Sequence, residues 1–314
     1  MINIGRAIVF NILMITILIT VQMVAKPLIY LVNYQDIPAY KIAINAIVTD
    51  LKTDYELKSV TVNMQNIDEI SNQIKKDKPK LTIGVGTKAT KLLLSKLKKE
   101  PILFTMVFRP ERTDLVKSLK FPGRNATGVA LDIPLDLQFK TLREVFPYLR
   151  RIGTLYTPYL DQNLINDAIK IAENYDFTLT ANEVYSKDQI QSQLEKLFSN
   201  QIQLLWSTAD QKIYSTTSLQ YILLSLNRFK IPYMGLSKSY LKLGAYISLD
   251  PDPKHIGEKT AKMARRMIQK RQNPMITPVE FSDEVNYSIN EKVMNQFQFK
   301  LPQNVLDNAE TLVK

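Results

Sequence analysis

The chain has 314 residues, of which 45% are hydrophobic and 23% are charged. This globular composition excludes disordered, collagen-like and coiled-coil chains, and the length allows one large domain or two of typical size. The 41 Lys and Arg residues exceed the 30 Asp and Glu residues, which gives a net charge of +11. Because the basic residues are spread along the chain, we assign this charge to solvated surface and expect no nucleic-acid partner.

The chain contains no Cys and a single His, His255. The first fact excludes disulfides, thiolate metal sites and Cys nucleophiles. The second leaves little acid-base or metal chemistry, because imidazole is the usual base near neutral pH and the commonest ligand of transition metals. No GxSxG nucleophile motif occurs. We therefore expect no catalytic residue, no metal site and no cofactor.

The chain begins with an apolar segment. Residues 1–6 carry one positive side chain and no acid, residues 7–21 are nearly all apolar, and residues 22–25 end on Ala25. This is the layout of a secretory signal, and the apolar part is shorter than the about 20 residues that span a bilayer. Met23 departs from the small-residue cleavage rule, so a cleaved signal helix, a retained membrane anchor and a buried cytosolic helix stay open. We predict a signal peptide or anchor over residues 1–25 and a periplasmic location.

From Pro27 onward, continuous apolar runs alternate with amphipathic stretches. Continuous apolar runs are typical of parallel strands that are covered on both faces. The alternation of strand and helix indicates a doubly wound α/β layer. The predicted strands are 28–33, 59–63, 81–85 and 102–107, and the predicted helices are 38–51, 67–76 and 87–98.

The segment 121–130 (FPGRNATGVA) interrupts this rhythm with a Pro-Gly turn, after which the rhythm starts again. A turn rich in Pro and Asp at 250–253 then precedes a long helix from His255 to about Lys270. The pattern indicates two similar α/β halves that join near Gly128. In the second half we predict helices at 135–146, 162–174, 187–198 and 215–229, and strands at 152–156, 178–184, 204–207, 233–236 and 244–249.

A glycine-rich motif, Gly84-x-Gly86-x-x-Ala89, stands between a predicted strand and a predicted helix. It matches a dinucleotide fingerprint only in part, because no carboxylate follows about 20 residues later. A GxxxxGK[ST] phosphate loop is absent from the sequence. Two interpretations remain open. The N–H groups at the start of the Thr87 helix favour an acceptor group of a ligand, or the motif is a tight turn without a ligand.

Several stretches taken together resemble the ABC-transporter substrate-binding proteins of the tryptophan/tyrosine-binding kind, especially their proteobacterial branch. The resemblance lies in the order and spacing of these stretches, and it covers nearly the whole chain after residue 25. It implies a type I periplasmic-binding-protein fold, in which two Rossmann-like lobes joined by three crossings close on a small molecule. The stretches are 83–90 (IGVGTKAT), 115–158, 204–214 (LLWSTADQKIY), 231–261 and 279–290 (VEFSDEVNYSIN).

The resemblance also implies where the chain passes between the lobes: within 125–130, near 248–251 and after Pro274. We therefore expect residues 26–128 and 250–275 in lobe 1, and residues 129–249 and 276–314 in lobe 2. The expected function is an extracytoplasmic solute-binding protein of an ABC importer, a monomer that binds an amino acid or related amine and works with an ABC permease of the inner membrane. A membrane-tethered sensor with the same cleft and an enzyme on a Rossmann-like scaffold are the alternatives.

The candidate ligand contacts follow from the strand ends, because ligands of open α/β sheets bind outside the carboxyl ends of the strands. Hydroxyl groups and backbone amides suit a carboxylate or carbonyl, and aromatic rings suit an apolar face. Asp210 is expected to pair with a ligand amine or to cap the next helix. We assign Trp206 to the core rather than the cleft. The predicted contacts are Asn33, Tyr34, Gly86, Thr87, Thr105, Phe108, Tyr156, Thr157, Thr208, Asp210 and Ser237.

Overall fold

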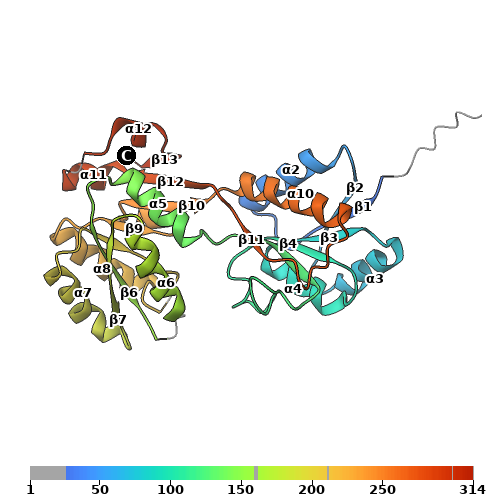
Figure 1. Cartoon of the computed structure of the whole chain (residues 1–314), viewed down its shortest axis with the longest axis horizontal. Coiled ribbons are helices and arrows are strands. Elements are labelled where there is room, and N and C mark those ends of the chain that lie inside the picture. The colour runs from blue at the N-terminus through green and yellow to red at the C-terminus, as the bar shows by residue number, and fades with distance from the viewer. Residues whose placement is uncertain (1–25, 159–161, 211, 299, 314) are drawn as a thin grey trace, which may run out of the picture.

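The computed structural model describes residues 26–158, 162–210, 212–298 and 300–313. The predicted signal peptide or anchor over residues 1–25 lies outside the described residues. The described chain forms two α/β lobes that lie side by side and are joined by narrow segments (Figure 1). Within these residues, none of the helices combines the length and the apolar character needed to cross a membrane.

The first lobe is built on a parallel sheet with the strand order β11-β5-β4-β3-β1-β2. Its central strands β3, β4 and β5 are completely buried, as expected for parallel strands that are covered by helices on both faces. The strands are β1 (Leu28–Asn33), β2 (Glu56–Thr61), β3 (Leu81–Val85), β4 (Ile102–Val107), β5 (Ala126–Ala130) and β11 (Glu280–Phe281).

Two pairs of helices cover this sheet (Figure 1). α2 (Pro38–Leu51) and α10 (Pro253–Gln269) share one core with the sheet, and α3 (Ile67–Asp77) and α4 (Gly86–Lys96) share the core on the other face. α10 follows the second lobe in sequence but packs on α2, β4 and β5 of the first. The Asp252 side chain caps it by accepting hydrogen bonds from the backbone N–H groups of Lys254 and His255.

The second lobe is built on a sheet with the strand order β13-β12-β10-β9-β8-β6-β7. In this sheet β10 and β12 are paired antiparallel, and the other recorded pairs are parallel. The carboxyl ends of β6, β8 and β9 therefore lie at one edge of the sheet. The strands are β6 (Arg151–Tyr156), β7 (Thr178–Glu183), β8 (Leu204–Trp206), β9 (Tyr233–Gly235), β10 (Ile247–Pro251), β12 (Val285–Asn290) and β13 (Thr311–Val313).

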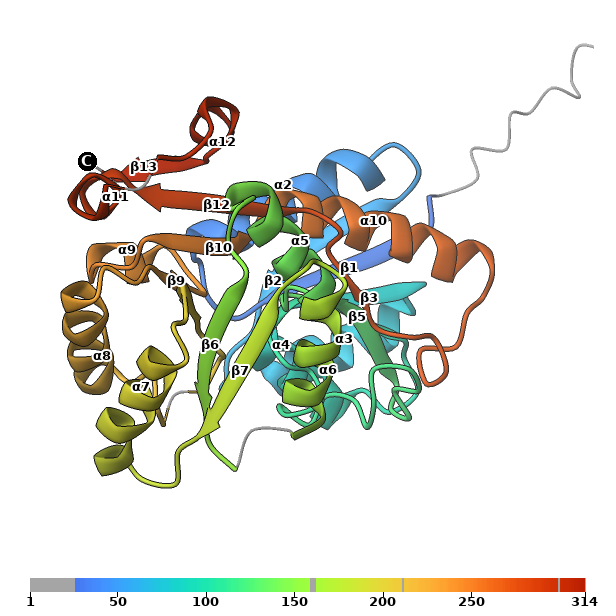
Figure 2. The same cartoon turned by 60° about the vertical axis from the view of Figure 1, so that its left-hand side comes forward.

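Helices cover both faces of this second sheet as well (Figure 2). One core contains buried side chains of α5 (Leu135–Val145), α6 (Gln162–Glu173), α11 (Glu291–Phe297) and α12 (Gln303–Asp307). The other core contains side chains of α7 (Ile190–Ser199), α8 (Thr216–Arg228) and α9 (Ser239–Lys242). A short 3-10 turn, Lys187–Gln189, precedes α7. The prediction of two doubly wound α/β lobes is therefore confirmed.

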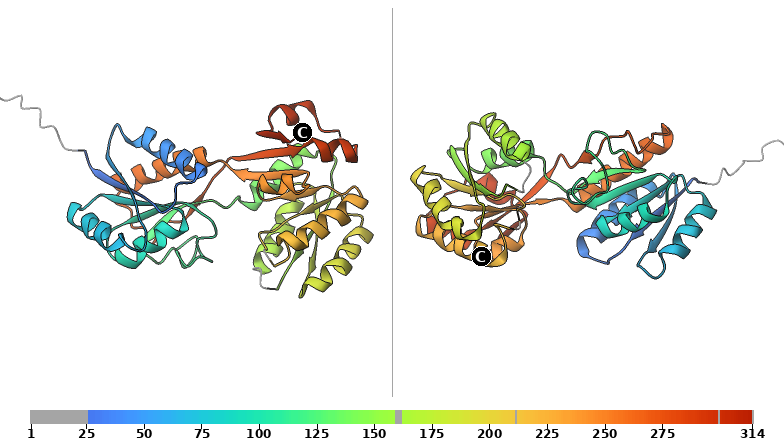
Figure 3. Two further views of the ribbon diagram at one scale, coloured as in Figure 1. Left: turned by 180° about the vertical axis from the view of Figure 1, so that it is seen from behind. Right: turned by 90° about the horizontal axis from the view of Figure 1, so that it is seen from below.

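The lobes are joined by three segments of the described chain (Figure 3). These are residues 131–134 between β5 and α5, Asp252 between β10 and α10, and residues 282–284 between β11 and β12. The first crossing was expected within 125–130, but those residues include β5, whose Thr127 hydroxyl donates a hydrogen bond of 2.7 Å to the Thr277 carbonyl oxygen.

The sheet pairing also changes the expected lobe limits. Residues 129–130 complete β5, and Glu280 and Phe281 pair in register with Val129 and Ala130 of that strand. These residues therefore lie in the first sheet, whereas we expected them in lobe 2. Residues 250–251, which we expected in lobe 1, end β10 of the second sheet. The sequence could not place these limits because a short apolar stretch has the same composition in an edge strand as in a connection.

Most predicted elements agree with the observed ones to within two residues. The main differences are β2, which begins at Glu56 rather than Ser59, β10, which begins at Ile247 rather than Gly244, and elements that were not predicted, among them β12, which pairs with β10. Residues 56–61 are partly exposed, since β2 is an edge strand, so they lack the continuous apolar run that identifies the buried strands.

Candidate functional site

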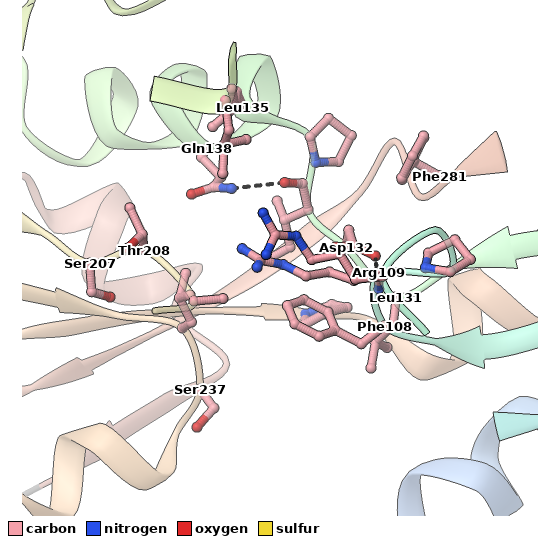
Figure 4. Close-up of a pocket in the computed structure, with 18 of the residues that line it drawn as sticks. Phe108, Arg109, Leu131, Asp132, Leu135, Gln138, Ser207, Thr208, Ser237 and Phe281 are labelled. Atoms are coloured by element: carbon pink, nitrogen blue, oxygen red, sulfur yellow. Dashed lines mark hydrogen bonds between the residues drawn. The ribbon is translucent and has the colours of Figure 1, made fainter. Parts of the chain in front are cut away.

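A cavity of about 440 Å³ lies between the two lobes (Figure 4). The first lobe contributes residues that follow β4 and β5, and the second contributes residues that follow β8 and β9. The cavity thus lies at carboxyl ends of strands from both sheets, where ligands of open α/β folds bind. Its lining residues are Phe108, Arg109, Pro110, Glu111, Arg112, Leu119, Leu131, Asp132, Ile133, Pro134, Leu135, Gln138, Leu164, Trp206, Ser207, Thr208, Ala209, Leu236, Ser237, Asp250, Pro251 and Phe281.

Much of the cavity wall is apolar. Phe108 follows β4 and Phe281 lies in β11 of the first lobe, Leu131 and Ile133 come from the first crossing, and Leu236 comes from the second lobe. Phe108 is 42% exposed although it is a large aromatic residue. An apolar concave surface with a small number of polar groups is typical of sites for small molecules.

Trp206 forms part of this wall and of the core of the second lobe. Its ring centroid is 5.4 Å from that of Phe139, and only 2% of the residue is exposed. Its indole N–H donates a hydrogen bond of 2.9 Å to Gln138 Oε1, and Gln138 Nε2 donates one of 2.8 Å to the carbonyl oxygen of Ile133. The assignment of Trp206 to the core is therefore incomplete, because the same side chain lines the cavity.

The hydroxyl groups of the second lobe differ in how they are bonded. Ser207 Oγ donates to the Met234 carbonyl oxygen at 2.7 Å, and the oxygens of Ser237 and Ser239 are 2.5 Å apart. Thr208 is 4% exposed, and its hydroxyl has no hydrogen-bond partner among the described residues. A buried hydroxyl without a partner costs about 1–3 kcal/mol. Thr208 therefore lines the cavity with a buried hydroxyl that lacks a partner among the described residues.

Charged groups reach the cavity from the first lobe. Arg109 has a left-handed backbone (φ 47°), its backbone N–H donates a hydrogen bond of 2.8 Å to Asp132 Oδ2, and its guanidinium carbon lies 5.4 Å from the centre of the Phe108 ring. Burial raises the pKa of Asp132, although the hydrogen bond from the Arg109 backbone and the Arg109 charge lower it. Arg112 and Glu111 also line the cavity.

The second lobe contributes one carboxylate, that of Asp250. Its Oδ1 accepts a hydrogen bond of 2.9 Å from the Lys238 backbone N–H, and its Oδ2 accepts one of 2.8 Å from Ser248 Oγ. Burial raises the pKa of Asp250, while these hydrogen bonds and the Lys238 charge lower it. Both oxygens therefore have protein donors before a ligand binds.

Three of the predicted contacts line the cavity: Phe108, Thr208 and Ser237. Asp210 does not. Its Oδ2 accepts hydrogen bonds from the Thr157 backbone N–H at 2.9 Å and the Thr157 hydroxyl at 2.7 Å, and its Oδ1 accepts one from the Lys212 backbone N–H at 3.1 Å. Asp210 therefore joins the turn after β8 to the end of β6, a structural role related to the capping alternative rather than to the amine-binding one.

Two other predicted contacts are explained by packing. Thr105 is completely buried, and its Oγ1 accepts a hydrogen bond of 2.8 Å from Thr260 Oγ1 of α10, so it lies beneath a helix. Gly86 has φ 82°, and a side chain there would overlap the Tyr40 ring. These contacts favour the interpretation of the glycine motif as a tight turn that lets α2 approach α4.

The remaining predicted contacts also lie outside the residues that line this cavity. Thr61 Oγ1 donates to Asn33 Oδ1 at 2.9 Å, and the Lys88 ammonium lies 5.1 Å from the centre of the Tyr34 ring. Tyr156 packs on Ile165, and Thr157 bonds to Asp210. Thr87, at the start of α4, is partly exposed. As ligand contacts these residues stay predictions.

The predicted contacts do not include Arg109, Asp132, Gln138 and Asp250. Arg109 comes two residues after the predicted strand 102–107, and Asp250 directly follows the predicted strand 244–249, so the strand-end rule could have included both. Gln138 lies inside a predicted amphipathic helix, where nothing in the sequence separates a residue that faces a cavity from one that faces solvent.

The chain was compared with known proteins. The family described as ABC transporter substrate binding protein matches residues 45–313. A tyrosine-binding protein of Clostridioides difficile (strain R20291) is 24% identical over 250 residues, which are 78% of this chain and 70% of that protein.

Two solved structures share the fold. The ligand-free, open structure of a substrate-binding protein with adhesive properties from Clostridium difficile has a TM-score of 0.67 at 20% identity, covering 92% of this chain and 99% of that one. An ABC domain from Streptococcus pneumonia in complex with L-Trp has a TM-score of 0.54 at 22% identity, covering 92% of this chain and 100% of that one. The match to the family spans most of the chain, and the chain therefore belongs to the ABC transporter substrate-binding proteins, which bind their substrates and are not enzymes.

Proposed function

We propose that this protein is the extracytoplasmic binding component of an ABC importer and captures an amino acid with an aromatic side chain in the cavity between its lobes. The observation that carries the proposal is the composition of the cavity wall, which combines the aromatic rings of Phe108, Trp206 and Phe281 with a Thr208 hydroxyl that has no partner among the described residues. One similar protein is named a tyrosine-binding protein, and another was solved in complex with L-Trp. Both agree with an aromatic amino acid as the ligand.

The lobes are the parts that move in this proposal, with residues 26–130 and 253–281 in the first and the described residues of 135–251 and 285–313 in the second. A ligand that contacts both lobes favours the conformations in which they are closer, because it gains contacts there that it lacks when they are apart. The permease of the inner membrane is the proposed partner, and the protein acts as a monomer.

The binding proposal can be tested through the single tryptophan of the chain, Trp206, which lines the cavity. We expect tyrosine to change the emission of Trp206 in a saturable way, with the affinity that calorimetry gives for the same ligand. Tryptophan is measured by calorimetry alone, because it emits itself. The Trp206→Phe variant is the control for the optical signal. The proposal is wrong if calorimetry detects binding of neither amino acid at millimolar concentration.

The transport proposal needs a cellular test. Cells that lack this chain should lose uptake of the labelled amino acid, and the wild-type chain should restore it. A variant that folds but does not bind the ligand in calorimetry should not restore uptake. Unchanged uptake in the cells that lack the chain would contradict a role in import while leaving the binding result intact.

A further inference from the structure

The two sides of the cavity carry complementary groups that were not predicted together. The first lobe presents the Arg109 guanidinium, and the second lobe presents the Thr208 hydroxyl. Figure 4 places Arg109 and Thr208 on opposite sides of the same space, with Phe108 below Arg109 and Gln138 above it. We propose that the ligand's carboxylate binds between Arg109 and Thr208, and that this carboxylate, rather than an amine, is the main polar determinant of specificity. The inference rests on the proposed function and names the ligand group that the site selects.

The backbone at Arg109 takes an uncommon conformation that neighbouring contacts hold. Arg109 and Met106 both have left-handed backbones, with φ 47° and φ 55°, which is uncommon for residues other than glycine, and the pairing of β4 with β5 shifts register between Thr105 and Val107. Such conformations are found where surrounding contacts hold them, often at ligand sites. Here the Arg109 backbone N–H donates a hydrogen bond of 2.8 Å to Asp132 Oδ2, and the guanidinium lies over the Phe108 ring.

Arg109 suits a carboxylate for two reasons. A guanidinium has five N–H donors in a planar fork, so it can bind both oxygens of a carboxylate and still interact with a neighbour such as Asp132. The cavity is also largely apolar, and a charge-assisted hydrogen bond is stronger where water is excluded. The guanidinium carbon lies 5.4 Å from the centre of the Phe108 ring, within the range of a cation–π contact.

Thr208 suits the same group from the other lobe. Its buried hydroxyl can donate a hydrogen bond, and a carboxylate accepts hydrogen bonds and donates none. One carboxylate can therefore bond to Arg109 and satisfy Thr208, and the two contacts join the lobes through the ligand. The apolar body of the ligand then faces Trp206 and Phe281.

The carboxylates at the cavity are less suited to select an amine. Asp132 accepts a hydrogen bond from the Arg109 backbone, Glu111 Oε1 accepts one of 2.9 Å from the Leu119 backbone N–H, and both oxygens of Asp250 have donors. Asp210 lies outside the lining residues and is bonded to Thr157. A ligand ammonium would therefore meet carboxylates that already accept hydrogen bonds from the protein. A ligand carboxylate, in contrast, supplies the acceptor that the Thr208 hydroxyl lacks among the described residues.

The test compares three ligands by calorimetry on the full chain: tyrosine, tyramine, which lacks the carboxylate, and 3-(4-hydroxyphenyl)propionate, which lacks the amine. We expect the propionate to bind within about tenfold of tyrosine. Loss of the partner of a buried charge costs at least about 2 kcal/mol, so tyramine should bind about thirtyfold more weakly or worse. The matching indole compounds extend the test to tryptophan.

The same ligands are then measured on variants. Arg109→Gln should weaken tyrosine about thirtyfold and reduce the difference between tyrosine and tyramine. Arg124→Gln is the matched control, since it removes the same charge from an ion pair with Asp114 on the same lobe, and it should leave affinity unchanged. Thr208→Ser should bind tyrosine nearly as well as the wild type, and Thr208→Val should bind it about tenfold more weakly.

The outcomes separate this inference from the proposed function. If tyrosine binds and tyramine binds equally well, or if the propionate does not bind, the carboxylate is not the determinant, while the aromatic amino acid remains the ligand. Because this comparison uses the wild-type chain, it holds even if Arg109→Gln does not fold. If no compound of either series binds, the proposed function fails, and this inference fails with it.

Discussion

The turns after β3 and β4 leave adjacent strands of the first sheet, but they serve different purposes. After β3 the chain enters α4 at once, and Gly86 allows the Tyr40 ring to pack directly against the backbone. Around the end of β4 the chain takes left-handed conformations, at Met106 within the strand and at Arg109 after it, and Phe108 and Arg109 line the cavity. A strand end therefore places a residue at the edge of the cleft, and local packing decides whether the polar groups of that residue stay available to a ligand.

The largest effect is expected when a side chain is added at Gly86, in the turn after β3. Gly86→Ala should lower the free energy of unfolding by about 3 kcal/mol or more, because the added methyl overlaps Tyr40 and the left-handed backbone disfavours a side chain. Gly244→Ala is the matched control, since Gly244 has φ 107° but no atom within 4 Å of an added Cβ, so it should cost about 1–2 kcal/mol. Chemical denaturation measures both. Equal costs would mean that Tyr40 does not limit this turn.

The turn after β8 also contains a polar group that is already bonded, the Asp210 carboxylate, and one without a partner among the described residues, the Thr208 hydroxyl. Asp210→Ala should cost about 2–3 kcal/mol of stability, because it removes the acceptor of three hydrogen bonds to Thr157 and the Lys212 backbone, and it should change ligand affinity by less than about threefold. Thr208→Val should leave the melting temperature unchanged or slightly higher. Loss of affinity in Asp210→Ala with unchanged stability would restore Asp210 as a ligand contact.

A smaller effect is expected at the wall shared by the core and the cavity. Gln138→Leu should destabilise the fold by about 1–3 kcal/mol, since it leaves the Trp206 indole N–H without its acceptor. It should also change the emission of Trp206 in the absence of ligand. Gln220→Leu, on α8, is a control for the chemical change at a site away from Trp206. Identical emission spectra of Gln138→Leu and the wild type would contradict the hydrogen bond.

The smallest effect is expected at the third crossing. His255 Nε2 lies 2.7 Å and Lys259 Nζ 3.1 Å from Asp283 Oδ1, and hydrogen bonds from these two side chains lower the pKa of Asp283 to about 2. Because the folded pKa is below the usual 3.8, this contact stabilises the fold above that value and is lost as the pH falls towards 2. Asp283 is 71% exposed, so Asp283→Asn should cost less than about 1 kcal/mol near neutral pH.

The pH series supplies the check on that variant. The difference in stability between Asp283→Asn and the wild type should shrink between pH 4 and 2, as far as the fold persists there. High salt at neutral pH should also reduce it, because exposed charges are screened. A difference that stays constant with pH would assign the effect to packing of the side chain rather than to its charge.

The sequence predicted most of the fold because burial leaves a clear pattern. The short continuous apolar runs of β3 and β4 are typical of parallel strands covered on both faces, and α2 and α10 carry apolar residues at helical spacing. The predicted limits of the edge strand β2 were displaced, because a partly exposed strand carries a weaker hydrophobic pattern. The limits of the lobes at β5 and β11 were wrong because pairing between distant strands is not a local property.

By itself the sequence determined the class of molecule: no thiol, one imidazole, two α/β halves, and a family whose members bind rather than convert their substrates. It also selected Phe108, Thr208 and Ser237, which the structure places in the wall of the cavity. Only the tertiary structure decided which groups at those ends are already bonded. Thr208 and Asp210 stand two residues apart after the same strand, yet the Asp210 carboxylate is held by Thr157 at the end of β6, while the Thr208 hydroxyl has no partner among the described residues. Hydrogen bonding between residues about fifty positions apart depends on how two strands lie in the sheet, and no pattern along the chain encodes it.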